Sequence, residues 1–254
     1  MTVPLAHDLT GVGPLLVLVH GITENRHAWD PLTDDLARDH TVPRVDLRGH
    51  GESPGGDAYG SNLLAEDVAA VVAGLGQDAG PPLLVGHSLG GAVVTANAAA
   101  GHAVRGVVNV DQMLDLGFFQ AGLQAQADAL RGPGFPAVVD GLFESMRGSL
   151  PDDEWARLAA LRRADQEVVL GVWALLLDSS PAELAQVIDA MLAAVRAPYL
   201  EVDGFDLGTG YADWLAQRLP HARLEVWDGM GHYPHLVDPQ RFLDRVRKFE
   251  AGLG

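Results

Sequence analysis

The stretch PLLVGHSLGGAVVTANAAA, residues 82–100, decides the fold of this chain of 254 residues. Its first part is apolar and rich in Leu and Val, which predicts a buried strand, and helical spacing begins at Leu89. Between the two stands G-x-S-x-G, with Ser88 between Gly86 and Gly90. Small residues at these two positions let neighbouring backbone pack close to a serine at the tip of a sharp strand-to-helix turn. The stretch therefore predicts Ser88 as a nucleophile at the end of a central strand.

Other apolar runs of the same format lie on both sides of this stretch. They are short and mostly end in Gly or Asp, and they cover residues 14–21, 41–49, 104–111, 198–204 and 222–229. Helical spacing is found between them, in residues 28–39, 63–75, 89–100, 211–219 and 240–249. Strands that alternate with helices predict an α/β fold with a mainly parallel sheet covered on both faces. Ligands of such sheets bind beyond the carboxyl ends of the strands, where these Gly and Asp residues are expected.

The interval 112–196 breaks this rhythm. It contains no convincing strand, is rich in Ala, Leu and Gln, and carries dispersed Phe and Trp residues. At the usual helix length of about 11–12 residues it holds about four helices. Because strands resume directly afterwards, we expect a helical lid, inserted before the penultimate strand of a core made of residues 1–111 and 197–254. A separate helical domain is the alternative. The residues expected to line a substrate pocket are Met113, Trp155 and Trp173.

A serine hydroxyl is a weak nucleophile unless a base is beside it, and His232 is the candidate for that base. It follows Gly231 in GHYPH, residues 231–235, directly after the last predicted strand. His235 competes for the role, but it lies deeper in the segment that enters the final helix. The pattern favours His232, held at a strand end on the same edge as Ser88.

Two backbone amides are expected to bind the oxyanion. Ile22 lies in HGITEN, residues 20–25, in the loop after the first clear strand, and Leu89 opens the helix behind Ser88. The amides and the positive dipole end of that helix would face the developing negative charge. His20 precedes a glycine at the strand edge and is expected to be structural. Asp46, Arg48 and His50 in DLRGHGES are expected to order their loop.

Composition narrows the classes of partner and cofactor. The chain has 34 acidic and 17 basic residues, a formal charge of −17, which disfavours nucleic acids and anionic membrane surfaces. It has no cysteine, and its histidines lack HExxH-type spacing, so we expect neither a metal nor another cofactor. The first apolar run is too short for a signal sequence or a membrane span, so we expect a soluble cytoplasmic protein, either a monomer or a homodimer.

In their order and spacing, HG at 20–21, DLRGHGES, GHSLGG and the late GHYPHLVDPQRF resemble the α/β-hydrolase superfamily. The resemblance covers residues 14–111 and 198–250. It implies a nucleophilic Ser88, a general base His232 and an acidic partner. The family usually supplies that acid from a G-x-x-D turn after the penultimate strand. Here Gly204-Phe205-Asp206 is one residue short. Asp206 is nevertheless the preferred acid, and Asp111, which closes the strand before the lid, is the alternative.

The expected reaction is hydrolysis of a carboxylic ester or lactone of a small, largely apolar substrate through an acyl-serine. Three other functions stay open on the same fold. A carbon–carbon bond hydrolase would use the same triad on a diketone. A cofactor-free lyase would bind a cyanohydrin or related small molecule. A ligand receptor that keeps the triad but signals through its lid is the possibility without catalysis.

Overall fold

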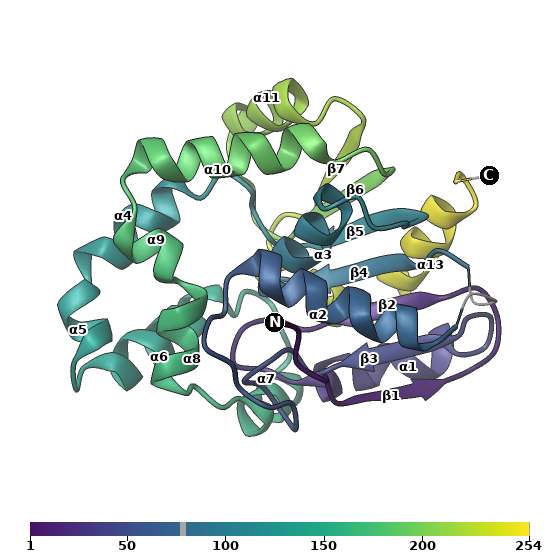
Figure 1. Ribbon diagram of the computed structural model, residues 1–254, viewed down its shortest axis with the longest axis horizontal. Helices are drawn as coiled ribbons and strands as arrows, with labels where there is room; N and C mark the ends of the chain where they lie inside the picture. The colour runs from purple at the N-terminus through teal and green to yellow at the C-terminus, as the bar shows by residue number, and fades with distance from the viewer. Residues whose placement is uncertain (77–79, 254) are drawn as a thin grey trace.

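A seven-stranded sheet forms the centre of the molecule (Figure 1). The computed structural model describes residues 1–76 and 80–253. The strand order is β1-β3-β2-β4-β5-β6-β7, with β1 antiparallel and all other pairs parallel. The strands are β1 (His7–Thr10), β2 (Leu16–Val19), β3 (Val42–Val45), β4 (Leu83–His87), β5 (Gly106–Val110), β6 (Tyr199–Asp203) and β7 (Ala222–Val226). The mainly parallel sheet predicted from the apolar runs is confirmed.

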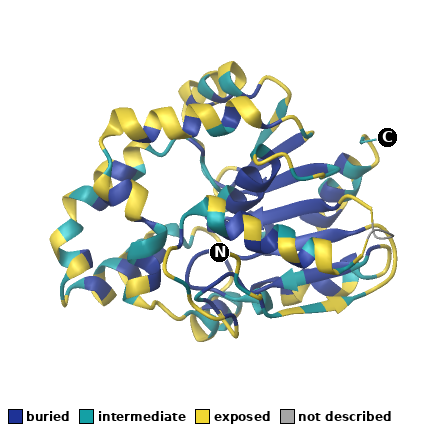
Figure 2. Ribbon diagram, in the orientation of Figure 1, coloured by how far each residue is buried: buried dark blue, intermediate teal, exposed yellow. Residues whose placement is uncertain are grey.

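Helices cover both faces of the sheet because side chains alternate along each buried strand. Val17 and Val19 of β2 join one buried cluster, whereas Leu16 and Leu18 join the other. Helices α2 (Ser61–Gly74) and α3 (Leu89–Ala99) pack on the first face, and α1 (Asp30–Leu36) and α13 (Pro239–Glu250) on the second. Figure 2 shows the central strands almost wholly buried. The remaining core helices are η1 (Arg26–Trp29), α11 (Gly208–Arg218) and α12 (Pro234–Val237).

A purely helical insertion connects β5 to β6. Among the described residues it contains helices and no strand, and Figure 1 shows α4 to α9 beyond one end of the sheet. Its helices are α4 (Gly117–Ala125), α5 (Ala127–Arg131), α6 (Phe135–Met146), α7 (Asp152–Leu161), α8 (Gln166–Val172), α9 (Ala174–Asp178) and α10 (Pro181–Ala194). The expected number of about four is therefore too low. Turns at Gln126 and Trp173 each divide what helical spacing alone would read as one helix.

The insertion is joined to the core by its main chain. The amide of His232 donates to the carbonyl of Met146 at 2.9 Å, and the amide of Arg163 donates to the carbonyl of Thr23 at 2.8 Å. A Cβ atom added to Gly148 would lie 2.4 Å from Cα of Gly231, so the two backbones touch. The insertion therefore rests on the loops that follow β2 and β7, at the carboxyl edge of the sheet.

Two elements were not predicted from the sequence. Strand β1 has the residues HDLT and alternates between exposed and half-buried positions at the sheet edge, so it lacks an apolar run. Helix α12 is only four residues long, too short to show a helical period. Neither changes the sheet order around Ser88. Among the described residues, no helix is both long and apolar enough to cross a bilayer.

Candidate active site

Ser88 stands at a sharp turn between β4 and α3, with φ 52° and ψ −122°. This backbone conformation is uncommon for a residue with a side chain, and such strain persists where the surroundings enforce it. Close packing of two glycines provides that enforcement. A Cβ atom on Gly86 would lie 2.1 Å from the carbonyl oxygen of Gly90, and one on Gly90 would lie 2.2 Å from the carbonyl oxygen of Val19. The structure thus supplies the physical reason for the spacing G-x-S-x-G.

His232 pairs with Asp111 at the same edge. The distance from Nδ1 of His232 to Oδ2 of Asp111 is 2.5 Å, and the two side chains are 10% and 7% exposed. Asp111 follows β5 directly and has φ 52°. Its own amide donates to the carbonyl of Val202 at 2.8 Å, and its Oδ1 accepts from the amide of Gly204 at 2.6 Å. The carboxylate is therefore held on β6 while its second oxygen faces the imidazole.

The preference for Asp206 as the partner of His232 is wrong in this geometry. Asp206 is exposed, and its Oδ1 accepts from the amide of Gly208 at 2.8 Å, in the turn that starts α11. Its amide donates to Oδ1 of Asp228 at 3.3 Å. The physical reason is the shortened turn after β6. Asp206 bonds backbone in its own turn, as Asp commonly does there, and it is Asp111 that reaches the imidazole.

His235, the competing histidine, is enclosed in the core. Its ring lies 4.9 Å from that of Trp29, 4.7 Å from that of His87 and 5.8 Å from that of Phe242, measured between centroids. Burial lowers the pKa of His235 well below its usual range. A neutral imidazole surrounded by aromatic rings contributes packing, and it is His232 that carries a carboxylate partner.

The two amides expected at the oxyanion site remain available. Within the described part of the chain, neither the amide of Ile22 nor that of Leu89 donates a hydrogen bond, whereas the amide of Ser88 donates to the carbonyl of Val110 at 2.9 Å. Nor is Ser88 Oγ hydrogen-bonded to His232 among these residues. Such contacts are often long in unliganded hydrolases and tighten when substrate binds.

The other histidine and loop residues singled out in the sequence have structural contacts. His20 faces the carbonyl of Gly21 with Nδ1 at 2.7 Å and accepts from the amide of Leu47 with Nε2 at 3.0 Å. Burial, then the nearby His20, lowers the pKa of His50 to about 4. Asp46 and Arg48 form contacts that order the loop of residues 46–53. Asp46 accepts from the amides of Arg26 and Glu52, and Arg48 forms a two-pronged ion pair with Asp67.

The three expected pocket residues lie in different surroundings. Trp173 is buried within the insertion and packs edge-on against Phe119, with centroids 6.0 Å apart. Trp155 is half-buried and packs edge-on against Tyr233, the residue after His232, at 6.4 Å. Met113 is half-buried against the core cluster on the α3 side. Only Trp155 contacts a residue adjacent to the proposed base.

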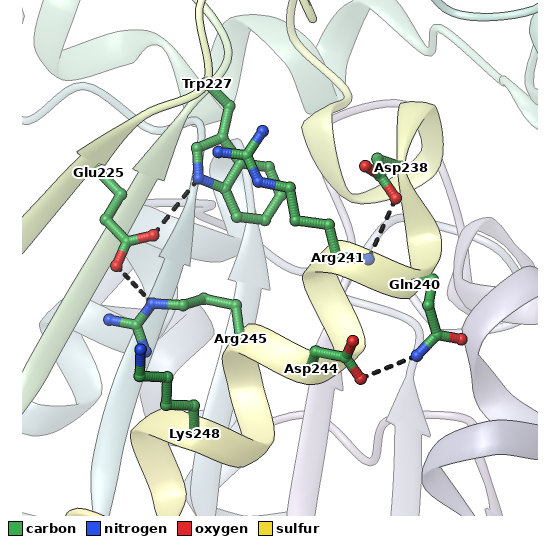
Figure 3. Close-up of a pocket in the computed structure, with 8 residues that line it drawn as sticks. All are labelled: Glu225, Trp227, Asp238, Gln240, Arg241, Asp244, Arg245 and Lys248. Carbon is green, nitrogen blue, oxygen red and sulfur yellow. Dashed lines mark hydrogen bonds and ion pairs between the residues drawn. The ribbon is translucent and has the colours of Figure 1, made fainter.

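The hollow drawn in Figure 3 is separate from these residues. It is open and lies between β7 and α13. None of the residues that line it belongs to the Ser88 turn, the His232–Asp111 pair or the loop of residues 20–25. Two contacts inside the hollow engage three of its charged residues. Glu225 accepts from Nε of Arg245 at 2.5 Å, and the guanidinium of Arg241 lies 4.0 Å from the ring centroid of Trp227. The candidate site is accordingly built on the Ser88 turn and not on this hollow.

Several polar residues near the site were missed in the sequence. Glu24 is buried in the loop after β2, and Tyr233 and His87 are buried beside His232. On β6, Glu201 and Asp203 are buried close to Asp111, and burial is the main cause that raises the pKa of both carboxyls, that of Glu201 to about 8. The only signals in the sequence were the positions of these residues inside HGITEN, GHS, GHYPH and YLEVD. A sequence motif does not show whether an acidic side chain is buried.

The sheet order, the turn at Ser88 and the late histidine define an α/β hydrolase. The model of the Alpha/beta hydrolase family matches residues 16–245, and the chain belongs to that family. It is 25% identical over 249 residues to "Esterase YbfF" of Escherichia coli (strain K12), covering 92% of each chain. It is 42% identical over 103 residues to "2-(acetamidomethylene)succinate hydrolase" of Mesorhizobium japonicum (strain LMG 29417 / CECT 9101 / MAFF 303099), a match that spans 40% of this chain and 36% of that protein. The solved structure "Crystal Structure of E-2-(Acetamidomethylene)succinate Hydrolase" superposes with a TM-score of 0.72 at 25% identity, covering 96% of this chain and 94% of the other.

Proposed function

We propose that this protein is a serine hydrolase that cleaves a carboxylic ester or lactone of a small, largely apolar substrate through an acyl-serine. The observation that carries the proposal is the convergence of the strained Ser88 turn and the His232–Asp111 pair on one edge of the sheet. Among the described residues, two amides near this edge donate no hydrogen bond: that of Leu89, directly after Ser88, and that of Ile22, in the loop after the neighbouring strand β2. The similarity to an esterase over nearly the whole chain supports an ester as the scissile group.

The mechanism follows from the roles of the hydrogen-bonding groups. Asp111 accepts a hydrogen bond from Nδ1–H of His232, which leaves Nε2 unprotonated and able to take the proton of Ser88 Oγ as this oxygen attacks the carbonyl carbon. The amides of Ile22 and Leu89 stabilise the resulting oxyanion. The imidazolium then protonates the departing alkoxide, and the alcohol leaves an acyl-serine. Water, deprotonated by His232, attacks the acyl carbon, and collapse of the second oxyanion releases the acid and the serine.

Labelling with a fluorophosphonate probe, followed by a turnover screen, tests the proposal. The wild type should be labelled once per chain, and Ser88→Ala should not be labelled. Short p-nitrophenyl esters and lactones should be turned over, and Ser88→Ala should lose that activity. A diketone in the same screen reports carbon–carbon bond hydrolysis. Equal labelling of wild type and Ser88→Ala, or turnover that survives the substitution, would contradict the proposal.

A further inference from the structure

A buried carboxylate connects the three loops of the candidate site. Glu24 lies in the loop after β2, two residues beyond Ile22, and is only 2% exposed. Its Oε2 accepts from the amide of Gly21 at 3.3 Å, and its Oε1 accepts from the hydroxyl of Tyr233 at 3.1 Å. One side chain thus holds the loop that carries the Ile22 amide and the loop that carries His232.

The third connection runs to the turn that carries Ser88. Oε2 of Glu24 lies 3.6 Å from Nδ1 of His87, the residue before the serine. The other ring nitrogen of His87, Nε2, donates to the carbonyl of His232 at 2.8 Å. The packing is tight, because a Cβ atom on Gly21 would lie 3.1 Å from Glu24, 3.1 Å from His87 and 3.3 Å from Cβ of Ser88.

The surroundings of Glu24 favour the charged form of its carboxyl despite burial. Burial raises the pKa of Glu24, but the facing His87 imidazole and the Arg162 guanidinium more than offset this and hold the pKa well below its usual range. Arg162 belongs to the helical insertion, and its guanidinium donates to the hydroxyl of Tyr233 at 2.9 Å. A chain of hydrogen bonds therefore runs from the insertion through Tyr233 to Glu24. A buried ion is costly unless hydrogen bonds and opposite charge compensate it. Gly21 and Tyr233 donate hydrogen bonds to Glu24, and Arg162 supplies a nearby positive charge.

We infer that Glu24 is a positioning residue for hydrolysis: its buried side chain, hydrogen-bonded to Gly21 and Tyr233 and facing His87, fixes the Ile22 amide relative to Ser88 and His232. This inference rests on the proposed serine hydrolase activity. Oxyanion donors act only at the correct distance from the developing charge, and a misplacement of about 1 Å can cost about a hundredfold in rate. The polar contacts of Glu24 are with Gly21, Tyr233 and His87, and none among the described residues is with Oγ of Ser88 or the ring of His232, so it acts through the loops that it joins.

The test compares Glu24→Gln with Asp67→Asn, both isosteric and both neutralising a buried carboxylate. Asp67 pairs with Arg48 and accepts from the amide of Val3, away from the three loops, and serves as the matched control. Fluorophosphonate titration counts competent active sites, so that turnover is expressed per folded site. We expect Glu24→Gln to lower kcat per site about tenfold or more with KM nearly unchanged, because the lost interaction acts in the transition state. Asp67→Asn should keep the kcat of the wild type.

A second variant keeps the inference testable if Glu24→Gln folds poorly. Tyr233→Phe removes one donor to Glu24 and keeps the ring against Trp155, so it should lower kcat per site by a smaller factor. The inference is overturned if Glu24→Gln and Tyr233→Phe both keep the wild-type kcat, if only KM changes, or if Asp67→Asn loses as much kcat as Glu24→Gln. Failure of the proposed function looks different, because the wild type itself would then show neither labelling at Ser88 nor ester turnover.

Discussion

At the scale of single residues, the choice of acid shows what a sequence can and cannot specify. Asp111 and Asp206 both follow strands that end on the same edge, so either could in principle approach His232. The choice depends on the path of the turn after β6. That turn sends Asp206 into solvent and leaves the amide of Gly204 to hold Asp111. The backbone conformation of residues 204–206 decides which acid pairs with His232, because both candidates are aspartates.

We therefore expect Asp111→Asn to cut kcat by up to about four orders of magnitude, because the amide cannot hold the imidazole in the required tautomer or stabilise its charged form. Ester turnover per fluorophosphonate-titrated site is the measurement. Asp206→Asn is the control and should stay close to the wild type. The opposite ranking of the two variants would restore Asp206 as the acid and refute the geometry described above.

A second residue-scale prediction concerns Glu201, whose pKa burial raises from 4.5 to about 8. The folded protein binds this proton more tightly than the unfolded chain, so the free energy of unfolding falls as pH rises from about 4.5 to about 8. Glu201→Gln cannot titrate, yet its amide oxygen can still accept from the hydroxyl of Tyr211. Urea unfolding between these pH values should show that the free energy of unfolding of the variant, relative to that of the wild type, increases with pH.

The control for this experiment is Glu144→Gln, a change of the same charge at an exposed position. Its unfolding curve should run parallel to that of the wild type over the whole range. If Glu201→Gln also runs parallel to the wild type, the Glu201 carboxyl is not the source of the pH dependence.

At the scale of elements, strands were more predictable than helices. Strands β2, β4, β5 and β6 are runs buried on both faces, a pattern that few other elements produce, whereas β3 and β7 are less buried. All six predicted runs are strands. The insertion is different because short helices packed on one another show no distinctive period. Breaks at Gln126 and Trp173 depend on how the helices turn in space. Composition could indicate helices there, but not their number.

The backbone contact between Gly148 and Gly231 gives an element-scale prediction. Gly148 has φ 58°, and its missing side chain makes room for the loop that precedes His232. Gly148→Ala should push that loop away and lower both ester turnover and the melting temperature, because a Cβ atom there meets backbone that cannot move aside cheaply. Circular dichroism melting and kcat per titrated site are the measurements.

Gly141→Ala is the matched control for this substitution. Gly141 lies within α6, in the same insertion, and a Cβ atom there meets nothing within 4 Å. Alanine should stabilise that helix by about 0.5–1 kcal/mol and leave turnover unchanged. A Gly148→Ala variant that behaves like Gly141→Ala would show that the loop yields without consequence.

At the scale of the whole molecule, we expect the net charge of −17 to lower the stability of the folded protein at low salt. Like charges repel one another in the compact state, and salt screens that repulsion. We expect the melting temperature at pH 8 to rise as sodium chloride is raised from about 10 mM to about 300 mM, a range over which the screening length shortens severalfold. Near pH 4.7, the isoelectric point of the sequence, the same salt series should have little effect. A salt response of equal size at both pH values would argue against net charge as its cause.

The attachment of the helical insertion has a consequence for protein engineering. Two of its contacts with the loops that follow β2 and β7 are hydrogen bonds between main-chain groups of Met146, Arg163, Thr23 and His232. Main-chain groups do not depend on which side chain a residue carries, proline apart. Arg162, which donates to the hydroxyl of Tyr233, and Gly148, which leaves room for Gly231, are side-chain-specific contacts that a redesign has to keep. We expect that other residues of the insertion can be varied while the loops that carry Ile22 and His232 keep their positions. We therefore expect that libraries built on this scaffold can vary substrate selectivity while Ser88, His232 and Asp111 keep their positions.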